Sequence, residues 1–110
     1  MSQLLLISDQ LQYRIFRKEV DLRMGFNALS GLVLKHLEQR VEEEKTVFMF
    51  FNKRRVLMKA ILYEKRRMSM HYERLHEDIF ELPHFEPDQK SIDMDPVMLM
   101  SLLNGLSLHL

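Results

Sequence analysis

The sequence predicts an α+β domain in which an antiparallel β-meander of about four strands packs against one long N-terminal helix, with a short C-terminal helix. Apolar residues recur at helical spacing between residues 22 and 40. From residue 46 onward, short apolar or alternating runs follow one another at intervals of about four to six residues, as expected for antiparallel strands. At 110 residues the chain has room for one modest core, so 1–110 should form a single domain.

The first third of the chain is predicted to contain a short strand and then the long helix. Residues 12–17, QYRIFR, fit a strand with Tyr13 and Ile15 on one side. Asp21 stands where an N-cap is expected, because its carboxylate can accept the free amide protons of the following turn. The helix is placed at 22–40, and its apolar face consists of Leu22, Phe26, Leu29, Val33 and Leu37.

Two glycines, Gly25 and Gly31, fall inside this predicted helix. Each costs about 1 kcal/mol relative to alanine, so a compensating reason is expected. Close packing of the helix against the sheet would supply that reason.

Four strands are predicted after residue 45. Residues 46–51, TVFMFF, form a continuous apolar run and are expected to be a central strand covered on both faces. Residues 57–63, a mainly apolar run in which Lys59 is the one charged residue, follow as the second strand. Residues 68–75 alternate in polarity and are the third strand. The run IFEL, residues 79–82, is the predicted fourth strand.

The C-terminal part of the chain is predicted to be a polar loop followed by a short helix. The loop covers residues 83–95 and contains two prolines. Asp95 and Pro96 mark the helix start as N-cap and first-turn proline. The helix is expected at 97–104, with Gly105 ending it.

The composition excludes several classes of protein. The chain carries 16 Lys and Arg and 16 Asp and Glu, so attraction to nucleic acid has to come from the distribution of charge. It contains no cysteine for disulfides or thiolate sites. The apolar block at residues 4–7 lacks the flanking residues of a signal peptide, and no run approaches the roughly 18 apolar residues of a membrane span. We therefore expect a cytoplasmic protein without a membrane contact.

The acidic and histidine residues form no pattern typical of catalysis. A two-metal strand-transfer centre needs several carboxylates brought together, whereas Glu73 and Glu81 stand singly at predicted strand ends. Residues 43–45 match the E-x-K of some nucleases only as a short coincidence in a charged loop. None of the five histidines has a zinc-binding spacing. We expect no enzymatic activity, no bound metal and no cofactor.

Cations gather in the predicted strand connections. One group occupies residues 53–55, a second occupies 65–67, and a third, 17–18, precedes the helix. Successive connections of a meander lie at opposite ends of the sheet, so the first two groups need not form one patch. Lys59 lies within a strand, where a charge is costly unless that face is open or the ammonium is paired.

The order of several motifs resembles a known family. Residues 20–33, VDLRMGFNALSGLV, resemble the D-M-R-x-G-[FI]-[DN]-G-L segment of the small accessory protein of insertion-sequence-66-type transposable elements, often called TnpB or the second-open-reading-frame protein. Residues 50–63 resemble its F-x-[NR]-[RK]-R-R-x-x-[IL]-K-x-[IL]-x-[WY] pattern. Later family segments are echoed by Arg74, Leu75, Phe80, Pro83, Leu99, Leu102, Leu103, Gly105 and Leu106. The resemblance covers about residues 12–108.

Two departures from the family pattern concern tryptophan. The tryptophan-aspartate-x-x-glycine hairpin of the family is YEKRR here, residues 63–67, and Leu82 stands at a later tryptophan position. A role in base stacking for those tryptophans is therefore not carried over. The resemblance also does not extend to the much larger RNA-guided nucleases that share the name TnpB.

The resemblance implies a non-catalytic helper of transposition, with the transposase of the same element as its partner. In one hypothesis it binds duplex DNA or the transpososome through phosphate contacts, and the candidate residues are Arg23, Lys53, Arg54, Arg55 and Lys59. In the alternative it is a protein adaptor that offers an adaptable apolar surface of Met94, Met98 and Met100. The same cations would also serve simply to keep hairpin tips soluble and sheet edges protected. The sequence indicates no oligomeric state.

Overall fold

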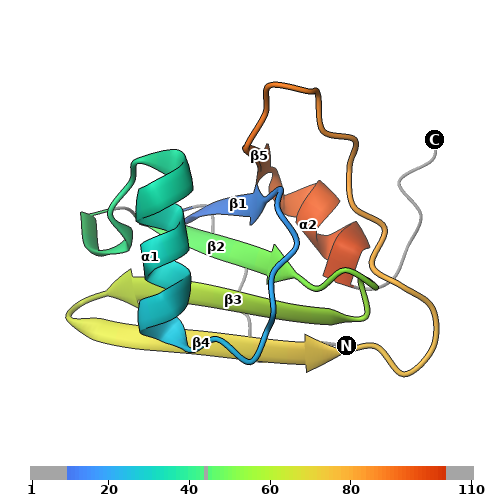
Figure 1. Cartoon of the computed structure of the whole chain (residues 1–110), viewed down its shortest axis with the longest axis horizontal. Helices are drawn as coiled ribbons and strands as arrows, with labels where there is room; N and C mark the ends of the chain where they lie inside the picture. The colour runs from blue at the N-terminus through green and yellow to red at the C-terminus, as the bar shows by residue number, and fades with distance from the viewer. Residues whose placement is uncertain (1–9, 44, 104–110) are drawn as a thin grey trace.

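A mixed five-stranded sheet, in the order β4-β3-β2-β1-β5, forms the centre of the computed structural model (Figure 1). The structure describes residues 10–43 and 45–103. Its strands are β1 (Gln12–Phe16), β2 (Thr46–Phe51), β3 (Leu57–Glu64), β4 (Arg67–Arg74) and β5 (Ser91–Met94). Its helices are α1 (Phe26–Leu37), the short 3-10 helix η1 (Val41–Glu43) and α2 (Pro96–Leu103). The α+β class is confirmed. The sheet has five strands where the predicted meander has about four, because β1 and β5 join it and the predicted strand at 79–82 does not form.

The pairing of β1 with β2 is parallel, and every other pairing in the sheet is antiparallel. Parallel neighbours require a crossover connection, which residues 17–45 supply, and this connection contains α1. The prediction of a purely antiparallel meander with a long N-terminal helix is therefore wrong at this point. The helix lies mid-chain, between β1 and β2. The parallel pairing was not predicted because an apolar run indicates a strand without giving its direction.

α1 is shorter than the predicted range 22–40 at both ends. Its N-cap is Gly25, which provides no side-chain cap. Asp21 instead accepts the backbone N–H of Arg23 at 3.0 Å, which closes a turn in the loop before the helix. Leu22 precedes the helix but is only 6% exposed. Its apolar side chain is therefore buried, as predicted for the helical face, without being part of the helix.

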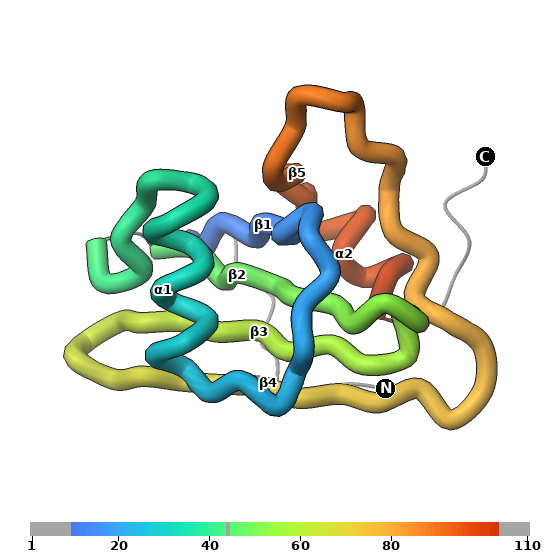
Figure 2. Tube along the Cα trace, viewed as in Figure 1, coloured from blue at the N-terminus to red at the C-terminus, as the bar shows by residue number. Residues whose placement is uncertain are grey.

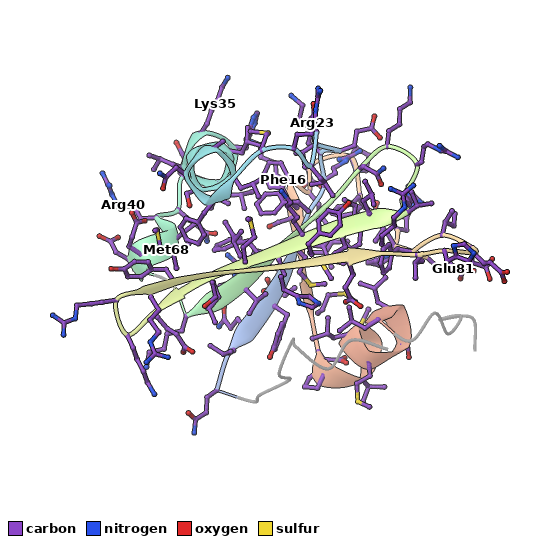
Figure 3. All side chains as sticks on the ribbon, turned by 90° about the horizontal axis from the view of Figure 1, so that it is seen from below. Phe16, Arg23, Lys35, Arg40, Met68 and Glu81 are labelled. Atoms are coloured by element: carbon purple, nitrogen blue, oxygen red, sulfur yellow. The ribbon has the colours of Figure 1, made fainter. Side chains whose placement is uncertain are left out.

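The sheet is covered on both faces, with α1 on one side and α2 on the other (Figure 3). Every residue of β2 is buried, which confirms its predicted central position. The core layer between α1 and the sheet includes Phe16, Leu29, Val33, Phe48, Phe50 and Ile61. The layer on the α2 side includes Tyr13, Ile15, Met49, Met58, Phe80 and Leu99.

The predicted strand at 79–82 is wrong, and a strand forms instead in the predicted loop 83–95. Phe80 is 1% exposed, but its backbone N–H donates to the carbonyl of Arg55 rather than to a strand neighbour. β5 pairs antiparallel with β1, with Ile92 opposite Ile15. Tertiary contact rather than local apolar pattern decides which of these two segments becomes a strand.

The C-terminal helix begins as predicted. The Asp95 carboxylate accepts the backbone N–H of Met98 at 2.9 Å, as an N-cap should. The predicted helix end at Gly105 lies outside the described residues. Within the described part of the chain, neither α1 nor α2 has the length and apolarity to cross a membrane.

Leu29→Ala should destabilise the protein more than Phe26→Ala. Leu29 belongs to α1 and is fully buried against the sheet, so its truncation should lower the free energy of unfolding by about 2–5 kcal/mol. Phe26 is only partly buried, so its truncation should cost less than the about 3–5 kcal/mol of a fully buried aromatic side chain. Denaturant unfolding measures both values. A loss below about 1 kcal/mol for Leu29→Ala would contradict the packing of α1 on the sheet.

Gly31→Ala should stabilise the protein. A Cβ atom at Gly31 or at Gly25 would meet nothing within 4 Å, so the close packing predicted for these glycines is wrong. Gly31 lies in the helix interior, where alanine is favoured by about 0.5–1 kcal/mol. Gly25→Ala is the matched control, because alanine is a poorer N-cap than glycine and should not stabilise. Destabilisation by Gly31→Ala in the same unfolding measurement would refute an open helix face there.

Candidate nucleic-acid interface

Asn52 organises the turn between β2 and β3 that carries the first group of cations. Its side-chain oxygen accepts the backbone N–H groups of Val56 and Leu57 at 3.1 and 3.0 Å. Its backbone carbonyl accepts the N–H of Arg55 at 3.0 Å. Arg55 adopts a left-handed conformation with φ of 59°. One polar side chain therefore fixes the shape of the whole turn.

The segment that follows β4 holds the same turn from its other side. Leu75 donates its N–H to the carbonyl of Val56 at 2.8 Å, and Phe80 donates to the carbonyl of Arg55 at 2.7 Å. Within the described ranges 10–43 and 45–103, the side chains of Lys53, Arg54 and Arg55 are exposed and form no ion pair. The turn thus presents three cations on a fixed backbone. We refer to residues 53–55 as the cationic turn.

The two predicted groups of strand-connection cations lie at opposite ends of the sheet, as expected. Figure 2 shows the cationic turn at one end and the hairpin with residues 65–67 at the other. The parallel pairing adds a feature that was not predicted. Because β1 and β2 run in the same direction, residues 17–18 after β1 lie at the same end as the cationic turn.

Arg17 serves the structure at this end. Its guanidinium donates to the carbonyls of Glu86, Pro87 and Gln89 at 2.9 to 3.0 Å. It also lies 5.9 Å from the ring centroid of Phe85. Arg17 therefore ties the loop before β5 to the end of β1 and is not a free phosphate ligand.

A second cationic cluster forms around the end of β1, where three separate segments meet. Phe16 pairs with Ser91 across the sheet, and Arg17 donates its N–H to the carbonyl of Lys90 at 3.0 Å. The ring of His36, near the end of α1, packs edge-on against Phe16 with 5.7 Å between centroids. The start of β5, the end of β1 and the last turn of α1 therefore converge on Phe16.

Three lysines contribute to the electrostatics around His36. The pKa of His36 is lowered, chiefly by burial and then by the positive charges of Lys18, Lys35 and Lys90. All three lysines are exposed. We name Lys18, Lys35 and Lys90 the lysine cluster. Sequence reasoning missed it because its members are far apart along the chain, and only the β1–β5 pairing and the crossover helix bring them together.

Arg23, a predicted phosphate contact, is exposed but already paired. Its side chain is 91% exposed and its guanidinium contacts both carboxylate oxygens of Asp21. These hydrogen bonds lower the pKa of Asp21 to about 2. The carboxylate thus remains charged above that pH, and it offsets the positive charge of Arg23 at neutral pH.

Lys59 lies in the interior and not on an open face. The residue is 9% exposed, and its ammonium donates to the carbonyl of Met24 at 2.9 Å. The same nitrogen lies 5.7 Å from the ring centroid of Tyr72. The open face that a phosphate contact requires is absent, so the structure assigns Lys59 to positioning the loop before α1.

A hollow of about 670 Å³ adjoins the cationic turn. Its lining mixes both signs of charge, with Arg17 and Arg55 beside Glu19 and Glu81. A polyanion would gain less here than at the outward side of the turn. In the described residues, no three His, Asp or Glu side chains gather as a metal site would require. Glu44, from the predicted E-x-K coincidence, is outside those residues.

A comparison with protein families gives the chain its context. The family model described as IS66 Orf2 like protein, TnpB_IS66, matches residues 11–110. The chain belongs to this family. A search of the curated proteins and a search of the solved structures each found no match. The two segments that carried the resemblance, 20–33 and 50–63, form the loop with α1 and the β2–β3 hairpin of this IS66 Orf2-like protein.

The lysine cluster should be measurable through His36. Its pKa should lie below the ordinary value of 6.5 and should rise in Lys18→Gln and in Lys90→Gln, because each substitution removes a nearby positive charge. Lys53→Gln, in the cationic turn, is the control and should leave the His36 pKa nearly unchanged. An NMR titration of the histidine ring protons measures these values. An unaltered pKa in both lysine variants would mean that these lysines do not face His36.

Proposed function

We propose that this IS66 Orf2-like protein assists transposition by holding phosphate groups of duplex DNA, without catalysing strand cleavage itself. Membership of the family makes it a transposition-associated accessory protein. The observation that carries the DNA contact is the cationic turn, where Lys53, Arg54 and Arg55 are exposed and have no ion-pair partner among the described residues. Its partners in this proposal are duplex DNA and the transposase of the same element.

The fixed backbone of the turn favours this role. The Asn52 side chain accepts two backbone N–H groups of the turn, and Leu75 and Phe80 donate their N–H groups to its carbonyls, so the turn is held before any ligand arrives. A preformed turn loses less conformational entropy on binding than a mobile one. Phosphate contacts of this kind position a protein on DNA and give affinity without reading sequence.

The backbone conformation of Arg55 is a second supporting observation. Arg55 has a positive φ of 59°. A left-handed conformation costs a residue with a Cβ about 1 kcal/mol, whereas glycine adopts it readily. An arginine at this position of the cationic turn is consistent with a use for its charge.

A protein adaptor role remains the second candidate function, and the apolar surface available for it is smaller than predicted. Met94 is 5% exposed and belongs to the core, so it is unavailable to a partner. α2 instead presents Val97, 74% exposed, and Met100, 50% exposed. These residues are three apart and share one side of the helix. A protein partner would dock there without DNA.

Replacing Arg54 and Arg55 together by alanine should weaken binding to all duplex sequences alike. If each arginine contacts one phosphate, the slope of log affinity against log salt should flatten by nearly two units, at about 0.9 per contact. Arg40→Ala with Lys45→Ala, two exposed cations outside the cationic turn, is the matched control for lost charge. Fluorescence anisotropy with labelled DNA over a range of salt measures the slopes, and unfolding should change by only about 0–1 kcal/mol.

The same measurement separates the two candidates. Wild-type protein with no DNA affinity at about 50 mM salt, alone and with its transposase, would overturn the DNA-binding proposal. Capture of the transposase without DNA, lost in Val97→Ser with Met100→Ser, would then favour the adaptor.

A further inference from the structure

β4 is a long edge strand with no neighbour on its outer side among the described strands. It has eight residues, Arg67–Arg74, and pairs only with β3 among the described strands. Figure 3 looks onto this edge, and the strand crosses the view between α1 and α2. The other edge strand, β5, has only four residues. A long open edge is a template for pairing with another strand, and natural proteins rarely leave one without a partner or a protecting feature.

The hairpin register identifies which backbone groups face outward. Lys65 and Arg66 form the two-residue turn, both with positive φ, and Glu64 opposite Arg67 closes it. In such a hairpin the closing pair exchanges both backbone hydrogen bonds, and the pattern alternates from there. Residues 68, 70 and 72 therefore direct their N–H and C=O groups away from β3.

The same three residues carry an exposed apolar stripe. Met68, Met70 and Tyr72 are 63%, 47% and 48% exposed. They lie on the α1 side of the sheet, since Met70 is opposite Ile61 of the core beneath α1. Outward backbone groups and exposed apolar side chains thus coincide on one strand.

We infer that β4 pairs antiparallel with β4 of a second copy of this chain, centred on Met70. In this register Met70 lies opposite Met70 of the second copy, and Met68 lies opposite Tyr72. On the other face, Arg67 lies opposite Glu73. The two-fold axis repeats each contact, so the Arg67–Glu73 pair occurs twice and is attractive, and the apolar pairs extend the stripe across the interface. Arg66 and Arg74 also come opposite each other, but both are solvent-exposed, where like charges are screened.

The charges of β4 favour a second copy as the occupant. The strand carries Arg67 near one end and Glu73 near the other, which is the arrangement that antiparallel self-pairing requires. Glu73 Oε2 is buried and accepts no hydrogen bond in the described structure, although His71 Nε2 lies 3.2 Å away. Arg67 of the second copy would bring a permanent positive charge to this carboxylate.

Self-pairing would also join cations that one chain keeps apart. The 65–67 hairpin of one copy would lie beside Arg74 of the second copy, at the end of the sheet where that copy has its cationic turn. Each end of the ten-stranded sheet would then combine cations from both chains. This consequence bears on the proposed DNA contact, whereas the dimer itself rests only on the edge, the stripe and the charge pairs.

Charge exchange between two variants tests the register. In the Arg67→Glu variant, the introduced glutamate faces Glu73 of the second copy. In the Glu73→Arg variant, the introduced arginine faces Arg67 of the second copy. Because like charges then face each other at both contacts, each variant alone should dimerise about ten-fold or more weakly than wild type. In a heterodimer of the two variants, a glutamate of one chain faces an arginine of the other at both contacts. An equimolar mixture of the two variants should therefore recover dimers close to wild-type affinity. Lys65→Glu, in the turn outside the pairs, is the control for a reversed charge.

Light scattering with size-exclusion chromatography on the full chain measures the masses, and dimers should have twice the 13.3 kDa of one chain. Hydrogen exchange should show amides 68, 70 and 72 protected in the wild-type dimer and exposed in either single variant. The inference is overturned by a monomeric wild type at about 100 μM, by single variants that dimerise normally, or by a mixture that does not recover dimers. If the protein binds DNA as a monomer, the dimer inference is wrong but the proposed function is not contradicted.

Discussion

The parallel pairing of β1 with β2 is the constraint on which the rest of the structure depends. Parallel neighbours cannot be joined by a tight turn, so residues 17–45 must cross one face of the sheet, and they place α1 there. The same pairing brings the carboxyl ends of both strands to one end of the molecule. Lys18 and the cationic turn share that end for this reason, and β1 remains free on its other side to pair with β5.

Lys59 couples this crossover to the sheet. A buried ammonium without a partner would be strongly destabilising, and here the Met24 carbonyl and the Tyr72 ring provide the compensation. Since Met24 precedes α1, the contact fixes the loop that leads into the helix. The positive charge also helps to keep the Asp21 carboxylate ionised, after the larger effect of Arg23. A residue first considered for DNA contact is thus better understood as a support for the fold.

Local pattern was sufficient for most elements and failed where distant contacts decide. The runs that became β2, β3 and β4, and the Asp95 cap of α2, are encoded by neighbouring residues. β5 was missed because SIDM is a weak strand pattern that pairing with β1 stabilises. The run around Phe80 buries its ring without forming a strand. For the site, the exposed cationic turn was predictable, whereas the lysine cluster requires the tertiary fold.

For the proposed DNA contact, a net charge of zero limits how the protein can reach DNA. At physiological salt the screening length is about 8 Å, so a phosphate in contact with the cationic turn responds mainly to nearby cations and little to the remaining charge. Local binding is therefore compatible with neutrality. Long-range attraction is not available, and neutral proteins associate far more slowly than those steered by an opposite field. An accessory protein of this kind gains most from delivery by a partner already on the DNA, or from a second copy that doubles its phosphate contacts.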